Sequence, residues 1–276
     1  MRCKSFSPTC KHYQYFLDYS ERRSILICSL AVLTASRTPR NVLWSLPVLA
    51  LVVLPVSIAH AQDQYCGAAN AATAVLVVHG GAFVIGTPDA TADSCKAFAQ
   101  QGWRAVNLDY PLGDLAAAGR YVHAAAVRER SRRRTVFVYG ESAGGGLAAL
   151  AAARGWVDGG FAWAPVTDLV SWKAGEARGL SFWDWIIDSS RSTLKSISAI
   201  TWASRHSAPL LVVHGRSDQL VSLSQSQRLK LRWPKMTLQI TAGGHEQFEP
   251  SYLNATKTSL TYLKKLLAAI TRPRFR

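Results

Sequence analysis

Short apolar runs alternate with longer amphipathic stretches from residue 74 to residue 270, and this alternation constrains the fold more than any other feature. The apolar runs have the length and composition of buried strands and lie at 74–79, 103–108, 135–139, 160–164, 209–214 and 236–240. The stretches with helical character lie at 91–101, 114–130, 142–154, 222–231 and 252–270. Continuous apolar strands separated by helices are typical of a sheet that is covered on both faces. The sequence therefore predicts an α/β fold with a mostly parallel sheet and helices on both faces.

Residues 168–206 interrupt this alternation. The segment is rich in Trp and Ser and is too long for a plain connection. One interpretation is a short lid inserted over the strand ends, in which Trp172, Trp183 and Phe182 would line a pocket. The other is a surface excursion whose aromatic side chains pack onto the core.

The first 61 residues differ from the rest of the chain. They carry seven basic and two acidic residues and include the uncharged apolar run 42–58, which Ala59-His60-Ala61 follows. A basic region, an apolar region and an A-x-A site are typical of a secretory signal peptide. We expect cleavage after Ala61, which gives a secreted or periplasmic domain at 62–276. The alternative is an uncleaved membrane anchor, for which the run is short and interrupted by Pro47 and Pro55.

The net charge of +15 over 276 residues raises the question of nucleic-acid binding. Part of the excess positive charge lies in residues 1–61, and a further part lies in the basic run 128–134. Basic runs of this kind usually lie on a solvated face of the protein. This run lacks the interleaved aromatic residues of a single-strand binding surface. We therefore expect no nucleic-acid partner, and contact with a membrane only if 42–58 remains uncleaved.

Two cysteines, Cys66 and Cys95, follow the predicted cleavage site. In an exported chain an even pair favours a disulfide, which would close a loop of about 30 residues. The alternative is two separate buried thiols.

Gly140-Glu141-Ser142-Ala143-Gly144 is a G-x-S-x-G motif between a predicted strand and a predicted helix. This strand–turn–helix context is the one in which the motif exposes a nucleophilic serine at a sharp turn. A serine hydroxyl needs a base, and the base needs a carboxylate that orients it. Asp218 and His245 follow the next strands in the chain order expected for this topology. The sequence therefore predicts Ser142, Asp218 and His245 as one catalytic set.

His79-Gly80-Gly81 follows the first strand of the domain. Small residues at this place allow backbone N–H groups to approach a developing oxyanion. A tight turn is the alternative for the motif in isolation.

Other polar candidates have simpler interpretations. Asp168 is expected to cap a helix, and His123, His206 and His214 receive no catalytic role. The chain has no H-E-x-x-H or C-x-x-C motif and no cluster of carboxylates, so we expect neither a metal nor a cofactor.

Over residues 74–270 the chain resembles the α/β-hydrolase superfamily, and within it the hormone-sensitive-lipase-like esterases and related small carboxylesterases. The matching segments are HGGAF (79–83), VNLDYPL (106–112), GESAGG (140–145), HGRSDQLV (214–221) and GGH (243–245). Ala82 departs from the usual third glycine of that subgroup, and Glu141 stands where Asp is common.

The resemblance implies an α/β-hydrolase fold with Ser142 as nucleophile, His245 as general base and Asp218 as its orienting carboxylate. It also implies an oxyanion hole formed by the amides of Gly80, Gly81 and Ala143. The expected function is a serine hydrolase that cleaves small-molecule carboxylic esters through an acyl-enzyme. The alternatives are a peptidase of the same fold and a non-catalytic binding protein on a hydrolase scaffold.

Overall fold

The computed structural model describes residues 62–174, 190–245 and 251–271. A seven-stranded sheet lies at its centre, with the strand order β1-β3-β2-β4-β5-β6-β7. The strands are β1 (Gln64–Cys66), β2 (Thr73–Val78), β3 (Arg104–Leu108), β4 (Thr135–Glu141), β5 (Gly159–Trp163), β6 (Leu210–Gly215) and β7 (Met236–Thr241). All neighbouring strands are parallel except β1, which pairs with β3 in the antiparallel direction. The predicted mostly parallel sheet is confirmed.

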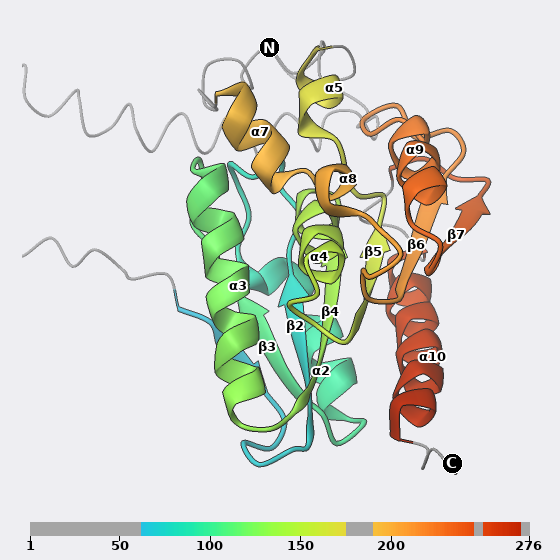
Figure 1. Cartoon of the computed structure of the whole chain (residues 1–276). Helices are drawn as coiled ribbons and strands as arrows, with labels where there is room; N and C mark the ends of the chain where they lie inside the picture. Colours follow the sequence, from blue (N-terminus) through green and yellow to red (C-terminus); the bar gives the residue numbers. More distant parts are fainter. Residues whose placement is uncertain (1–61, 175–189, 246–250, 272–276) are drawn as a thin grey trace, which may run out of the picture. The chain divides into compact units, whose positions relative to one another are not determined.

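Helices cover both faces of the sheet (Figure 1). One face carries α3 (Leu115–Ser131) and α4 (Ala143–Ala153), with α9 (Ser224–Arg232) beside β7, and the other carries α2 (Ala92–Ala99) and α10 (Ser251–Thr271). A short 3₁₀ helix, η1 (Pro88–Thr91), precedes α2. The apolar runs are continuous because alternate residues of a strand point into two separate cores. In β2, Leu76 and Val78 belong to the core beneath α3 and α4, whereas Val75 and Val77 belong to the core beneath α2 and α10.

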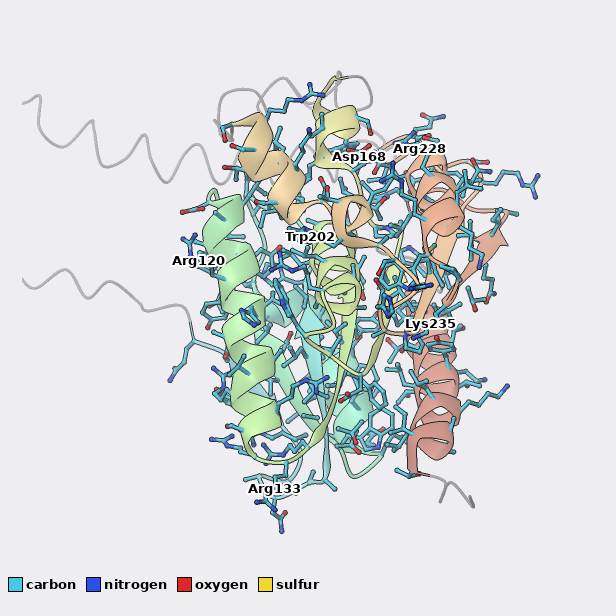
Figure 2. The ribbon with its side chains drawn as sticks, viewed as in Figure 1. Arg120, Arg133, Asp168, Trp202, Arg228 and Lys235 are labelled. Atoms are coloured by element: carbon cyan, nitrogen blue, oxygen red, sulfur yellow. A yellow bond between two sulfur atoms is a disulfide. The ribbon has the colours of Figure 1, made fainter. Side chains whose placement is uncertain are left out.

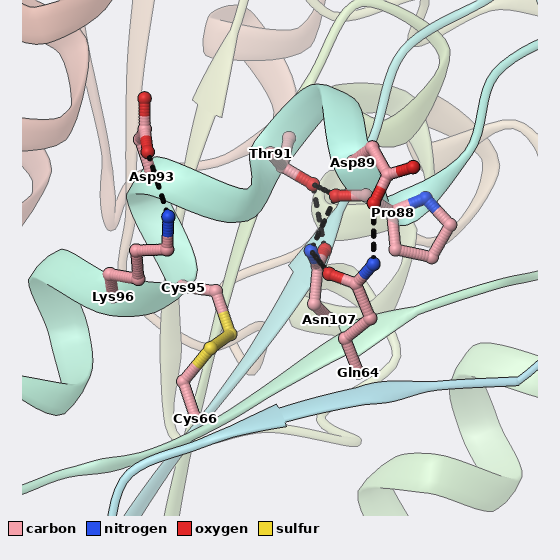
Figure 3. Close-up of a disulfide and its surroundings, with 9 residues drawn as sticks. All are labelled: Gln64, Cys66, Pro88, Asp89, Thr91, Asp93, Cys95, Lys96 and Asn107. Carbon is pink, nitrogen blue, oxygen red and sulfur yellow. Dashed lines mark hydrogen bonds and ion pairs between the residues drawn. A yellow bond between two sulfur atoms is a disulfide. The ribbon is translucent and has the colours of Figure 1, made fainter.

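The strand β1 has no counterpart in the sequence predictions. Its three residues, QYC, are too few to show a period, and tertiary contacts hold them in place. A disulfide joins Cys66 on β1 to Cys95 on α2, so the bridged interpretation of this pair is the correct one (Figure 3). Gln64 reinforces this attachment, because its side-chain amide donates to Asp89 at 2.6 Å and its amide oxygen accepts from Asn107 at 3.3 Å.

The basic run 128–134 is only partly solvated. Arg132 and Arg133 are exposed, but Glu129 and Arg134 are buried, and Arg134 Nη1 lies 2.5 Å from Glu129 Oε2. Arg134 also donates from Nε to the Ala71 carbonyl at 2.8 Å. The expectation of a solvated face is therefore wrong for these two residues, because burial of one carboxylate recruits the guanidinium that neutralises it. Arg133 lies at the end of the molecule opposite Asp168 and Arg228 (Figure 2).

Parts of the insertion 168–206 lie within the described residues. They form α5 (Leu169–Ala174), α7 (Arg191–Ile197) and α8 (Ala199–Trp202), whereas Phe182 and Trp183 lie outside the described residues. Trp172 is buried in the core and donates from Nε1 to the Leu220 carbonyl at 3.1 Å, so this aromatic side chain packs inward.

The base of the insertion is tied to α9. Gln225 on that helix accepts the backbone amides of Thr167 and Asp168 at 3.0 and 2.7 Å. Nearby, Arg228 Nη2 donates to Ser171 Oγ at 2.8 Å. Whether the insertion forms a lid stays a prediction.

The leader 1–61, with its predicted signal peptide or anchor, lies outside the described residues. Among the helices that are described, none combines the length and the apolarity that a membrane span needs.

Candidate active site

Ser142 occupies a strained turn between β4 and α4. Its backbone has φ 52° and ψ −117°, a region that a residue with a side chain seldom adopts. The turn is fixed by a hydrogen bond from the Ser142 amide to the Trp163 carbonyl at 2.8 Å and by another from the Gly146 amide to the Ser142 carbonyl at 2.9 Å. The predicted helix over 142–154 therefore begins one residue later, and Ser142 is its N-cap.

Two glycines of the motif allow this turn because the backbones approach too closely for a side chain. A Cβ atom at Gly140 would lie 2.2 Å from the Gly144 carbonyl oxygen. One at Gly144 would lie 2.2 Å from the carbonyl oxygen of Val78 and 2.3 Å from that of His79. The start of α4 thus packs directly on the end of β2, beside the Gly80-Gly81 loop.

The structure brings Asp218 and His245 to Ser142 from two other strand ends. Ser142 follows β4, Asp218 follows β6 and His245 follows β7, so the carboxyl ends of three parallel strands carry the three residues. His245 Nε2 lies 2.9 Å from Ser142 Oγ, and His245 Nδ1 lies 2.7 Å from Asp218 Oδ2. The hydroxyl, the imidazole and the carboxylate form one continuous hydrogen-bonded line.

Asp218 lies in a site that favours its ionised form. Its Oδ1 accepts the backbone amides of Leu220 at 3.0 Å and Val221 at 2.8 Å. Burial by itself raises the pKa of the Asp218 carboxyl, but the N–H donors of His214 and His245 and the Val221 amide outweigh it. The pKa therefore lies well below its ordinary value, and the carboxylate stays charged opposite His245.

The residues predicted to form an oxyanion hole lie just after β2 and at the start of α4. Gly81 has φ 111°, and a Cβ atom there would lie 2.0 Å from the Ile85 carbonyl oxygen, so the loop needs glycine at this position. The His79 side chain stabilises the loop. Its Nδ1 donates to the Gly80 carbonyl at 2.7 Å, and its ring stacks on Tyr110. Burial lowers the pKa of His79, which keeps the ring neutral. Ala143 is the first residue of α4, so its amide has no acceptor within that helix.

Ala82 does not prevent the loop from adopting a left-handed backbone. Its φ is 53°, and that of Phe83 is 65°. The buried Phe83 ring packs close to Gly146 on α4, where its Cζ would lie 3.6 Å from an added Cβ atom. Glu141, the other departure from the subgroup pattern, is buried and accepts a hydrogen bond from the Tyr139 hydroxyl.

The remaining candidates have the contacts of structural residues, with one exception. Asp168 caps α5 by accepting the Ser171 amide at 3.2 Å, His123 stacks on Trp156, and His206 accepts from Arg205 at the surface. The exception is His214, whose Nε2 lies 3.3 Å from Asp218 Oδ2. Sequence reasoning missed this contact, although the spacing of four residues between the histidine and the aspartate was visible in HGRSD.

No group of three or more His, Cys, Asp or Glu side chains within 62–174, 190–245 and 255–271 is arranged to hold a metal ion.

Comparisons with known proteins agree with this architecture. The BD-FAE family model matches residues 64–233. Among curated proteins, no match was found. Three solved structures illustrate the likeness of fold. Esterase 2 of Thermogutta terrifontis phosphonylated by sarin is 17% identical, with 78% of this chain and 91% of that chain covered and a TM-score of 0.62.

The butyrate-bound form of the same esterase is 18% identical, with 78% of this chain and 91% of that chain covered and a TM-score of 0.61. A truncated carbohydrate esterase from gut microbiota is 19% identical, with 72% of this chain and 87% of that chain covered and a TM-score of 0.54. At these identities the likeness concerns the fold, and the predicted α/β-hydrolase fold is confirmed.

Proposed function

Because the chain belongs to the BD-FAE family and has the α/β-hydrolase fold, we propose that it is a serine hydrolase that cleaves carboxylic esters of small molecules. The observation that carries this proposal is the line from Ser142 Oγ through His245 to Asp218, with distances of 2.9 and 2.7 Å. Both distances are those of hydrogen bonds, so His245 can take the proton of the Ser142 hydroxyl while Asp218 orients the imidazole.

In the proposed reaction, Ser142 Oγ attacks the ester carbonyl carbon while His245 Nε2 takes the hydroxyl proton. The ionised Asp218 accepts the Nδ1–H of His245, which fixes the tautomer and stabilises the imidazolium that forms. His245 then protonates the departing alcohol and leaves an acyl group on Ser142. Water, deprotonated by His245, attacks the carbonyl carbon of this acyl-enzyme. His245 then returns the proton to Ser142 Oγ as the carboxylic acid departs.

The amides of Gly80, Gly81 and Ala143 would stabilise the oxyanion of each tetrahedral intermediate. Such donors are preorganised, because the turn and the helix hold them in position before the reaction starts. Loss of one donor typically lowers kcat by two to three orders of magnitude. The close packing of Gly144 supports this assignment, because it brings the start of α4 against Val78 and His79, the residues that precede Gly80.

Fluorophosphonate labelling tests the nucleophile. Wild-type protein should become labelled, and Ser142→Ala should lose both the label and the hydrolysis of p-nitrophenyl acetate. Ser131→Ala is the matched control, because Ser131 is exposed at the end of α3 and should leave both unchanged. Labelling that persists in Ser142→Ala would refute the assignment, and a wild-type protein without labelling or hydrolysis would favour the non-catalytic alternative.

A second experiment separates esterase from peptidase. The solved relatives named above are esterases, one of them bound to butyrate, which favours short-chain esters as first substrates. We expect turnover of p-nitrophenyl esters and little turnover of aminoacyl p-nitroanilides. The reverse preference would favour a peptidase of the same fold.

We also propose that the domain works outside the cytoplasm. The disulfide between Cys66 and Cys95 supports this, because such bonds persist in oxidising compartments. Mass spectrometry of the exported protein should find Gln62 as the first residue. A chain that retains 42–58 would instead support a membrane anchor.

A further inference from the structure

His214 is a fully buried histidine at the carboxyl end of β6, and the reaction proposed above gives it no task. Its side chain is in contact with three polar groups. Nε2 lies 2.8 Å from the Val221 carbonyl oxygen and 3.3 Å from Asp218 Oδ2, and Nδ1 lies 2.7 Å from Ser226 Oγ. Both nitrogens of this buried imidazole have hydrogen-bond partners, so its surroundings fix the orientation of the ring.

The chemistry of these partners decides which nitrogen carries a proton. A carbonyl and a carboxylate can only accept, so Nε2 of His214 must be the donor to both. The Ser226 hydroxyl can donate to Nδ1 when the ring is neutral, or accept from it when the ring is charged. The ring therefore forms hydrogen bonds on two sides. Its Nδ1 contacts Ser226 on α9, and its Nε2 contacts Val221 in the turn that follows β6.

The contacts of His214 complete the surroundings of the Asp218 carboxylate. Oδ1 accepts two backbone amides, from Leu220 and Val221, and Oδ2 faces both His245 Nδ1 and His214 Nε2. Val221 takes part twice, because its amide donates to Asp218 and its carbonyl accepts from His214. Donors on both oxygens oppose rotation of the carboxylate about its Cβ–Cγ bond. A rotated carboxylate would turn Oδ2 away from His245.

We propose that His214 is a positioning residue, which fixes the Asp218 carboxylate and the turn 218–221 in the orientation that His245 requires. This inference rests on the proposed function, because it assigns His214 a part in the same reaction. It acts through Asp218 and touches neither the substrate nor Ser142. Hydrolysis needs the base and the nucleophile within about half an ångström of the productive geometry, and a shift of about 1 Å can cost roughly 100-fold in rate.

Three variants test the proposal by steady-state kinetics on p-nitrophenyl acetate. His214→Ala removes the Nε2 donor and should lower kcat roughly 10- to 100-fold with KM within about twofold of wild type. His214→Gln places an amide N–H near the former Nε2 and should recover most of that loss. His206→Gln, a change at an exposed histidine, should match wild type. Rates are compared well below the melting temperature of every variant, so that lost stability does not enter kcat.

Two results would overturn the proposal. One is a kcat within about twofold of wild type in His214→Ala, since the donor would then be dispensable. The other is an equal loss in His214→Ala and His214→Gln, since the side chain would then matter only for packing. Ser142→Ala separates this inference from the proposed function: if that variant keeps its fluorophosphonate label, the proposed function fails, whereas a lost label with unaffected His214 variants refutes only the role of His214.

Discussion

Removal of the disulfide between Cys66 and Cys95 should lower the stability of the fold by an amount that the structure allows us to calculate. The two cysteines are 29 residues apart, and the bond ties the short strand β1 to α2. In the chain-entropy model, a bridge that closes a loop of about 30 residues destabilises the unfolded state by about 3.6 kcal/mol at 25 °C. For a domain of this size, that free energy corresponds to a fall in melting temperature of roughly 7–14 °C.

Thermal unfolding followed by circular dichroism measures this shift in the double variant Cys66→Ala/Cys95→Ala. Wild-type protein in excess dithiothreitol is the control, because it breaks the bond without changing a side chain. Both samples should melt at a similar temperature, and dithiothreitol should not change the melting of the double variant. A fall of less than about 2 °C in both samples would refute the reasoning, because the unfolded chain would then gain little freedom from the broken bond.

Three further predictions concern the packing and the charges. Gly144→Ala places a Cβ atom 2.2 Å from a backbone carbonyl oxygen of β2, so we expect a loss of at least about 2 kcal/mol in urea unfolding, or no folded protein. Glu129→Ala leaves Arg134 buried without its carboxylate and should cost about 3–5 kcal/mol, whereas Asp93→Ala, in an exposed ion pair, should change stability by under about 1 kcal/mol. Because the Asp218 carboxyl has a pKa depressed from 3.8, the stability it contributes is complete above that value and is lost as pH falls below it. The free energy of unfolding of wild type relative to Asp218→Asn, measured in urea at neutral pH and at about pH 3, should therefore decrease at the lower pH, and a constant difference would contradict the depressed pKa.

Five of the six strands that the sequence predicted have side chains buried on both faces. The sixth, β7, lies at the edge of the sheet, and three of its six residues are exposed. The runs in β2, β4 and β6 are continuous and apolar, so their composition alone indicated a covered parallel sheet. β1 was missed because its three residues carry no such pattern. It becomes a strand only because β3 offers backbone partners and Cys95 lies within reach of Cys66.

Charged and aromatic residues were the least predictable part of the chain. Arg134 belongs to a basic run that composition assigns to the surface, yet it is buried against Glu129. Trp172 lies in a segment with no clear period, and only the packing beneath α5 places it in the core. In both cases a contact that is distant in sequence helps to decide the environment. Arg134 donates to the Ala71 carbonyl, and Trp172 donates to the Leu220 carbonyl.

The sequence by itself determined the order of the elements and the identity of Ser142, Asp218 and His245 as candidates, because strand-end positions and chain order follow from local pattern. Tertiary structure decided their geometry. Ser142 and His245 are 103 residues apart in the chain, and only the parallel pairing of β4, β5, β6 and β7 brings their side chains to 2.9 Å. The surroundings of Asp218, with His214 behind it, likewise exist only in the folded chain, because hydrogen bonds between side chains depend on positions in space rather than on spacing in sequence.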